Sequence, residues 1–335
     1  MENTPLPSSA SEPYPDNGIT SDEAAALYAP LDTDVGPTRT DSAALTTMEG
    51  WYALATGFLY LMFVRATTWL PFHVSVVVLM TLVSLVLMLV FTVRVARSII
   101  SRRALIINFT LSSLLILPKV LIPILATRFP TWSGWPFIGG QYMRYQGLLK
   151  HVEGLDGLIL MWFAACIGVG VSRLIREMKM LLPISVVLAS VDMYVVFGGG
   201  LVTQATQGHS PIAAAAMRAL TVKLPTMHVT RGAAPLQLAI GMADFLFIAL
   251  FFACFKKFGV AAWNTFIVMC AVLSVYMLIV AYKDLPLPAL VPIAVVVVGM
   301  NLRQFRYERS EGFALLYAGI IVTVVGGIFW FLSRK

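Results

Sequence analysis

The sequence predicts an all-α membrane protein, a polytopic bundle of about nine transmembrane helices. Hydrophobic residues make up 59% of the 335 residues and charged residues only 12%, whereas soluble domains average about 45–50% apolar and about 25% charged residues. From Gly50 onward, apolar runs alternate with short charged or Pro- and Gly-containing stretches. Most of these runs reach the ~20 residues that a helix needs to cross the hydrocarbon core of a bilayer. An ordinary soluble enzyme is therefore excluded.

The first 49 residues differ from the rest of the chain. They hold nine acids and a single base, Arg39, among many Pro, Ser and Thr residues. Such a composition cannot bury enough apolar surface to fold and favours disorder. We expect residues 1–49 to form a disordered acidic tail. This tail does not have the basic start and apolar core of a signal peptide.

Nine spans are expected, with eight as the alternative because the first run is short and ends at Arg65. The predicted spans are 50–66, 74–93, 104–126, 155–172, 181–202, 233–254, 260–282, 285–301 and 313–332. They divide the chain into the tail at 1–49, N-terminal helices at 50–175, a core at 176–302 and an additional C-terminal helix within 303–335. Lys119 lies inside the third span, between Pro118 and Pro123, and is expected to snorkel or to mark a break.

Basic residues concentrate in the short loops on one side of this topology. They are Arg94, Arg97, Arg102, Arg103, Arg173, Arg176, Lys179, Lys256, Lys257, Arg303, Arg306 and Arg309. Short cytoplasmic loops are enriched in Lys and Arg, so these loops are predicted to face the cytoplasm, and with nine spans the N-terminal tail does too. With eight spans the tail would lie outside. The net charge of +7 thus indicates a membrane surface rather than nucleic acid as the partner. The expected location is the plasma (inner) membrane.

Two carboxylates lie in the middle of apolar spans, Asp192 and Asp244, each eleven residues from the start of its predicted span. At ~1.5 Å per residue, each would lie ~16 Å deep. Inserting an Asp at a helix centre costs roughly 2.5–3.5 kcal/mol, so two at one depth need a reason. Three explanations stay open: paired acid–base catalysis, a proton or cation relay in a transporter, and a polar contact between two helices.

The residues around the two Asp carry a resemblance to a known family. Gly241-Met242-Ala243 precedes Asp244, Tyr194-Val195-Val196-Phe197-Gly198 follows Asp192, and Pro288-Ala289-Leu290 comes later in the chain. In this order the motifs resemble those of the presenilin and signal peptide peptidase family of intramembrane aspartyl proteases. The resemblance covers about residues 181–300. Val191 stands where the family has Tyr before the first Asp, and Ala243 stands where it has the second Gly of Gly-x-Gly-Asp. A further span, 313–332, follows the Pro-Ala-Leu motif. The resemblance is therefore to a divergent, prokaryotic member.

The resemblance implies an aspartic endopeptidase that hydrolyses peptide bonds within transmembrane helices. Asp192 and Asp244 would be catalytic and would activate water, with carboxyl groups roughly 3–6 Å apart. Gly241 would permit tight packing near Asp244, and the Pro288, Ala289 and Leu290 stretch would position the substrate. The alternatives are a proton-coupled transporter that uses the same carboxylates and an inactive relative that binds helices.

Partners and cofactors follow from the same interpretation. The expected partners are transmembrane-helix proteins or peptides and the lipid bilayer, with a homo-oligomer as an open option and no nucleic acid. No metal or other cofactor is expected, because the cysteines form no CxxC pair and the histidines no HExxH motif. The direction of the fifth and sixth spans is similar to that in signal peptide peptidases and implies substrates whose N-terminus lies in the cytoplasm.

Overall fold

The structure is a computed structural model, and it describes residues 39–68, 74–99, 101–128, 152, 154–197, 217, 219–224, 239–283 and 288–302. The chain divides into two compact units, Met1–Ala44 and Leu45–Lys335. Of the first unit only residues 39–44 are described, and they are helical. All contacts reported below lie within the second unit.

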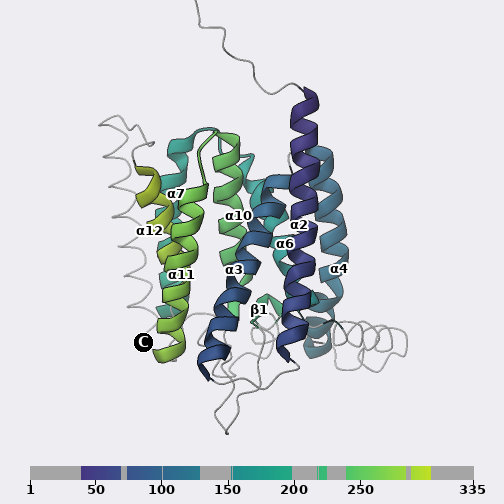
Figure 1. The fold of residues 1–335 in the computed structure, drawn as a ribbon, viewed down its shortest axis with the longest axis vertical. Coiled ribbons are helices and arrows are strands. Elements are labelled where there is room, and N and C mark those ends of the chain that lie inside the picture. Colours follow the sequence, from purple (N-terminus) through teal and green to yellow (C-terminus); the bar gives the residue numbers. More distant parts are fainter. Residues whose placement is uncertain are drawn as a thin grey trace, which may run out of the picture. The chain divides into compact units, whose positions relative to one another are not determined.

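The described residues are mostly helical (Figure 1). The elements are α2 (Arg39–Thr68), α3 (Val74–Ser98), α4 (Arg102–Arg128), α6 (Leu155–Ser172), the 3-10 turn η2 (Met178–Met180), α7 (Leu181–Phe197), the strands β1 (Thr221–Lys223) and β2 (Ala239–Gly241), α10 (Met242–Lys257), α11 (Trp263–Lys283) and α12 (Leu290–Asn301). This content agrees with the predicted helical class.

Four of the described helices are long and apolar enough to cross a membrane. These segments are Ser75–Ser98, Arg102–Leu121, Leu155–Ser172 and Trp263–Val280. The predicted count of nine spans is not supported by the described part of the chain. Helices α7, α10 and α12 have 17, 16 and 12 residues, fewer than the ~20 that span a bilayer without tilt or thinning. The predicted span 313–332 lies outside the described residues.

Two predicted boundaries are wrong. Helix α2 begins at Arg39, inside the segment 1–49 that was expected to be disordered; its residues 43–49 include Ala, Leu, Met and Glu, which are good helix formers. The predicted span 233–254 is not one helix, because Ala239–Gly241 forms strand β2 and α10 begins at Met242. Asp244 is therefore the third residue of its helix and not eleven residues into a span.

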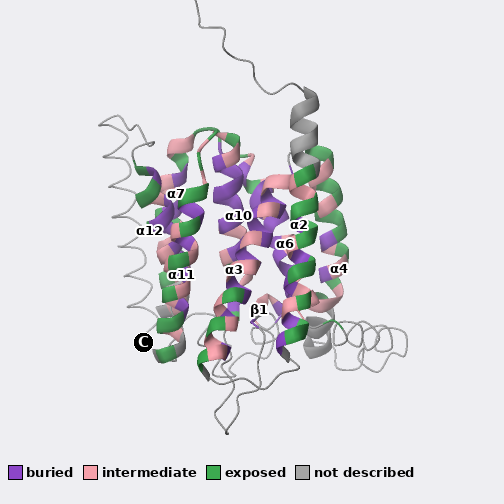
Figure 2. Cartoon of the chain, viewed as in Figure 1, coloured by how far each residue is buried: buried purple, intermediate pink, exposed green. Residues whose placement is uncertain are grey.

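Helix α6 lies at the centre of the packing, against α10, α3 and α4. A β-carbon on Gly168 of α6 would lie 2.4 Å from the carbonyl oxygen of Leu246 and 2.9 Å from the β-carbon of Ala249, both on α10. The two backbones are thus nearly in contact, as small residues allow between helices in membranes. Figure 2 shows buried residues concentrated on α6 and α10 and exposed residues on α2, α4 and α11. The exposed residues of α2 include Trp51 and Leu54, at 72% and 65% exposure.

The basic loops meet at one end of this unit, called the basic end below. Arg173 donates to the carbonyl oxygen of Ser101 at 2.9 Å, Lys257 to that of Ile175 at 2.6 Å, and Lys256 to that of Arg97. Three of the four loops that were predicted to share a side therefore lie together. The fourth, 303–309, lies outside the described residues.

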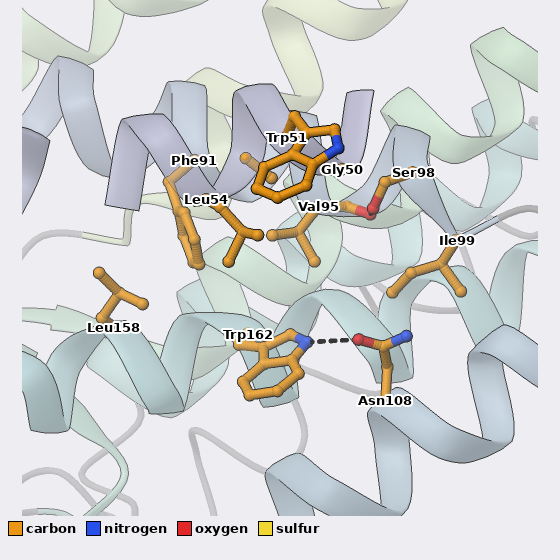
Figure 3. A pocket seen from close by; sticks show the side chains of 11 residues that line it. Gly50, Trp51, Leu54, Phe91, Val95, Ser98, Ile99, Asn108, Leu158 and Trp162 are labelled. Carbon is orange, nitrogen blue, oxygen red and sulfur yellow. Dashed lines mark hydrogen bonds between the residues drawn. The ribbon is translucent and has the colours of Figure 1, made fainter. Parts of the chain in front are cut away.

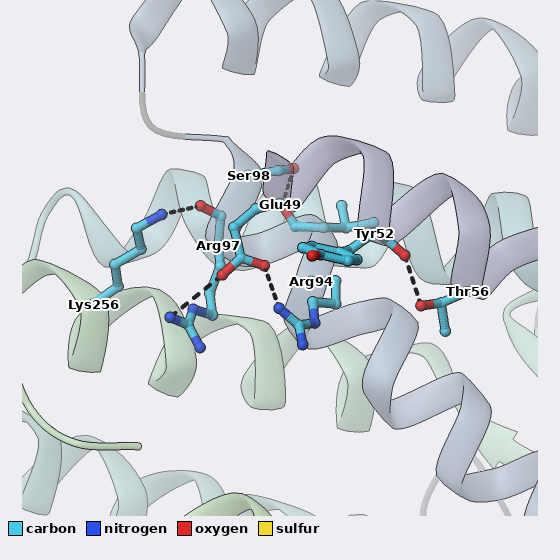
Figure 4. A network of polar contacts seen from close by, with 8 residues as sticks. Glu49, Tyr52, Thr56, Arg94, Arg97, Ser98 and Lys256 are labelled. Carbon is cyan, nitrogen blue, oxygen red and sulfur yellow. Dashed lines mark hydrogen bonds and ion pairs between the residues drawn. The ribbon is translucent and has the colours of Figure 1, made fainter. Parts of the chain in front are cut away.

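An ion pair connects α2 to α3 at the basic end (Figure 4). The carboxylate of Glu49 accepts from Arg94 at 2.7 Å and lies 3.4 Å from a guanidinium nitrogen of Arg97. The Arg94 guanidinium also lies 5.2 Å from the centre of the Tyr52 ring. Glu49, the last residue of the predicted tail, is thus held against α3 by charge.

Lys119 does not lie at a break. Helix α4 runs without interruption through Pro118 and Pro123, and the Lys119 ammonium lies 3.1 Å from the carboxylate of Asp156 on α6. The Lys119 side chain is 12% exposed. Its charge is therefore paired with a carboxylate near the start of the neighbouring helix α6.

Candidate active site

Asp192 lies five residues before the end of α7, and its carboxylate reaches the first residue of α12. The backbone N–H of Leu290 donates to Oδ2 of Asp192 at 2.8 Å. No side chain of α12 caps its own N-terminus at Ala289, where the first N–H groups of any helix have no partner within the helix. Asp192 supplies this cap from another helix, and its negative charge is favourable at the positive end of the helix dipole.

Asp244 lies beside the same end of α12. It lines a cavity of about 10 Å³ together with Ala289 and Ile293, with Leu273 of α11 and with residues of α3 and α10. Asp192 bonds to the N–H of Leu290, the residue after Ala289. Both carboxylates therefore approach the Pro288-Ala289-Leu290 stretch, although their separation of roughly 3–6 Å stays a prediction.

Gly241 ends β2 and immediately precedes α10. Its φ of −68° and ψ of 146° are open to any residue. A β-carbon on Gly241 would lie 3.5 Å from Oδ2 of Asp244, which is ordinary van der Waals contact. Gly241 therefore lies next to the carboxylate, where a β-carbon would also fit, and its role in packing near Asp244 stays a prediction.

The substrate-positioning residues that the sequence predicted lie together at the start of α12. Pro288 and Leu290 are buried, and Ala289 faces the cavity beside Asp244. The carbonyl oxygen of Pro288 accepts from the hydroxyl of Tyr276 on α11 at 2.7 Å. This stretch is thus held from one side by Asp192 and from another by Tyr276.

Tyr276 was not among the predicted site residues. Its hydroxyl donates to the carbonyl oxygen of Pro288, two residues before Leu290, whose N–H binds Asp192. The signal in the sequence was a tyrosine well inside the apolar span 260–282, because a buried hydroxyl normally finds a hydrogen-bond partner. The sequence did not show that the partner is Pro288.

A short antiparallel sheet leads directly into α10. Thr221 pairs with Gly241, Val222 with Ile240 and Lys223 with Ala239, and the N–H of Met242 donates to the carbonyl oxygen of Leu220 at 3.0 Å. Among the described residues the sheet consists of these two strands. Its extended backbone ends at Gly241, three residues before Asp244.

Two adjacent carboxyl groups can divide acid and base roles, because one can take a proton from water while the other donates one. The cavity beside Asp244 is about the size of a single water molecule. Among the described residues, no group of three or more His, Cys, Asp or Glu side chains is placed to hold a metal ion. Comparisons with family models, with curated proteins and with solved structures found no match to this chain.

Proposed function

We propose that the chain is an intramembrane aspartyl endopeptidase that hydrolyses peptide bonds within transmembrane helices. The observation that supports this most is the convergence of Asp192, Asp244 and the Pro288-Ala289-Leu290 stretch at one end of α12. A contact that only held helices together would need one carboxylate. Two carboxylates carry a cost in the membrane that acid–base chemistry explains.

In this proposal the pair activates a water molecule for attack on a peptide carbonyl carbon. One oxygen of Asp192 is engaged by the N–H of Leu290, which leaves its other oxygen for water or for Asp244. One carboxylate accepts a proton from the water while the other, protonated, donates to the peptide oxygen. The two groups titrate as a unit, so neither role belongs to one residue.

The substrate must become extended before it can react, because a helix shields its own peptide bonds. Unwound backbone inside a membrane needs hydrogen-bond partners. In this proposal the extended substrate adds a strand to the β1–β2 sheet beside Asp244, as peptides do in other proteins. The cavity of about 10 Å³ cannot hold a peptide, so binding requires the start of α12 to move away from the pair.

We further propose that α7, α10 and α12 lie in the membrane with the four long apolar helices and that the basic end faces the cytoplasm. Asp244 then lies about 20 Å from the basic end, measured along α10 to Lys257 at ~1.5 Å per residue. In a hydrocarbon core of ~30 Å this is the outer half. The expected substrates have a cytoplasmic N-terminus and are cut in the outer half of their span, in the plasma (inner) membrane.

The test is to reconstitute the purified protein in vesicles with a single-span substrate and to measure peptide masses and vesicle pH together. We expect fragments whose new ends lie inside the apolar span, with no proton flux. Substrate-dependent proton flux without fragments would replace this proposal with the transporter. Binding of the substrate with neither fragments nor flux would make the chain an inactive helix-binding protein.

A further inference from the structure

A second cavity lies between α2, α3, α4 and α6, away from the aspartate pair. Its volume is about 490 Å³, and its walls are mostly apolar, with Leu54 of α2, Phe91 and Val95 of α3, and Leu158 of α6 among them. This volume lies in the range of sites that hold small molecules or single chains of a larger ligand. The cavity is large enough for a ligand and shares no lining residue with the cavity beside Asp244.

The polar side chains on the cavity wall are hydrogen-bonded within the protein, and the hydroxyl of Ser98 donates to the carbonyl oxygen of Val95 at 2.8 Å. The indole N–H of Trp162 donates to Oδ1 of Asn108 at 3.2 Å, and the amide nitrogen of Asn108 donates to the carbonyl oxygen of Ala104 at 2.8 Å. Figure 3 shows Trp162 and Asn108 on the side opposite Trp51 and Leu54. These polar groups already satisfy one another, so the remaining surface favours hydrocarbon over water.

The cavity reaches the basic end of the unit. Gly50 and Trp51 line it one and two residues after Glu49, and Ser98 and Ile99 line it at the end of α3. Trp51 is 72% exposed, and exposed tryptophans of membrane proteins gather at the level of the lipid headgroups. This opening therefore lies where a phospholipid changes from headgroup to acyl chain.

Four arginines lie within four residues, along the chain, of the lining residues Val95, Ser98 and Ile99. Arg94 and Arg97 carry two positive charges against the single negative charge of Glu49. Arg102 and Arg103 are exposed, begin α4 just after Ile99, and have no acid in the first turn of their helix. Positive side chains at the N-terminus of a helix repel its dipole, so an anion bound there would relieve this repulsion.

We propose that this cavity binds an anionic phospholipid, with one acyl chain between α2 and α6 and the phosphate at Arg102 and Arg103. The occupant is a lipid of the surrounding bilayer, because the cavity joins an apolar space to a basic opening at headgroup depth. The bound chain fills the space between α2 and the rest of the unit. The site is independent of the aspartate pair.

Two matched glycines allow a direct test. A β-carbon on Gly50, which lines the cavity, or on Gly299, which is exposed on α12, would meet no atom within 4 Å. Gly50→Phe therefore adds a ring at the cavity wall from a β-carbon that has room, and Gly299→Phe adds the same side chain elsewhere. For the headgroup, the double variant Arg102→Gln/Arg103→Gln is compared with Arg176→Gln/Lys179→Gln, which removes the same charge from the loop after α6.

The probe is phosphatidylglycerol with a photoactivatable diazirine on one acyl chain, at a few per cent in phosphatidylcholine vesicles that hold the full-length protein. Cross-links mapped by mass spectrometry are expected on the peptide with Leu158 and Trp162. Gly50→Phe and Arg102→Gln/Arg103→Gln should each reduce this labelling at least fivefold, whereas both control variants should retain it.

Three results would overturn the proposal. The first is labelling of Leu158 and Trp162 no stronger than that of lipid-facing α11, at Val275 for example. The second is labelling that is unchanged in Gly50→Phe. The third is equal labelling by a diazirine phosphatidylcholine, because the basic opening would then select no headgroup. Gel filtration of each variant in detergent shows that it is folded before labelling is compared.

Discussion

Replacing Gly168 with alanine tests how closely α6 and α10 must pack to place Asp244. The added β-carbon would lie 2.4 Å from the carbonyl oxygen of Leu246, whereas ordinary contact begins at 3.4 Å, so the helices must separate by about 1 Å. The obstructing atom belongs to the backbone and cannot rotate away. Overpacking of this kind costs about 1–3 kcal/mol. Leu246 lies two residues after Asp244, and a misplacement of ~1 Å in an active site can cost about 100-fold in rate.

Gly170→Ala is the matched control in the same helix. A β-carbon there would meet its nearest neighbour, a methyl group of Leu105, at 4.0 Å. Alanine is also favoured over glycine inside a helix by roughly 0.5–1 kcal/mol. The melting temperature in detergent and the cleavage rate should therefore both fall in Gly168→Ala. Both should stay at the wild-type level in Gly170→Ala. Equal melting temperatures for the two variants would refute the close packing of α6 and α10.

Three further substitutions test single contacts. Asp192→Asn keeps an acceptor for the N–H of Leu290, so its free energy of unfolding should be about 1 kcal/mol higher than that of Asp192→Ala, as measured by thermal unfolding. Equal stability of the two variants would argue against this cap. Tyr276→Phe removes the hydrogen bond to Pro288 at the start of α12. It should lower the free energy of unfolding by about 1 kcal/mol and slow cleavage without abolishing it. An unchanged cleavage rate would show that Tyr276 has no part in the site. Glu49→Gln should cost about 1 kcal/mol at low salt, and less at high salt, because the charge on Arg94 and Arg97 is then uncompensated.

The helices that the sequence predicted best are those with clear ends. The predicted span 155–172 is α6 to the residue, because Gly154 has a φ of 85° and precedes the apolar run, and Arg173 follows it. A long apolar run bounded by glycine and by a charged residue predicts a single helix with defined ends. The fold class could therefore be read from the composition and from such runs.

The strand β2 could not be predicted in this way. Ala239-Ile240-Gly241 is apolar and short, and periodicity alone does not separate such a run from the first turn of a helix. What makes it a strand is its pairing with Thr221–Lys223, a contact between distant parts of the chain. The predicted depth of Asp244 was wrong for the same reason, because it counted the residues of β2 as helix.

Residue identity was enough to predict Asp192 and Asp244 as members of the candidate site, but not to predict their contacts. Asp192 and Asp244 stood out because carboxylates are expensive in apolar spans. The hydrogen bond from Leu290 to Asp192, the role of Tyr276 and the ion pair between Lys119 and Asp156 depend on how each helix is rotated toward its neighbours. These helix rotations cannot be predicted from the sequence of one chain.

The most direct test of the central claim is the rate at which a single-span substrate is cleaved by the wild type and by Asp192→Asn, Asp244→Asn and Asp156→Asn. Each of the first two changes keeps the shape of the side chain and removes its proton chemistry, so each should lower the rate by at least about 100-fold. Asp156, on α6 beside Lys119, lies outside the pair, and its variant should remain active. Cleavage at the wild-type rate by either Asp192→Asn or Asp244→Asn would contradict the account.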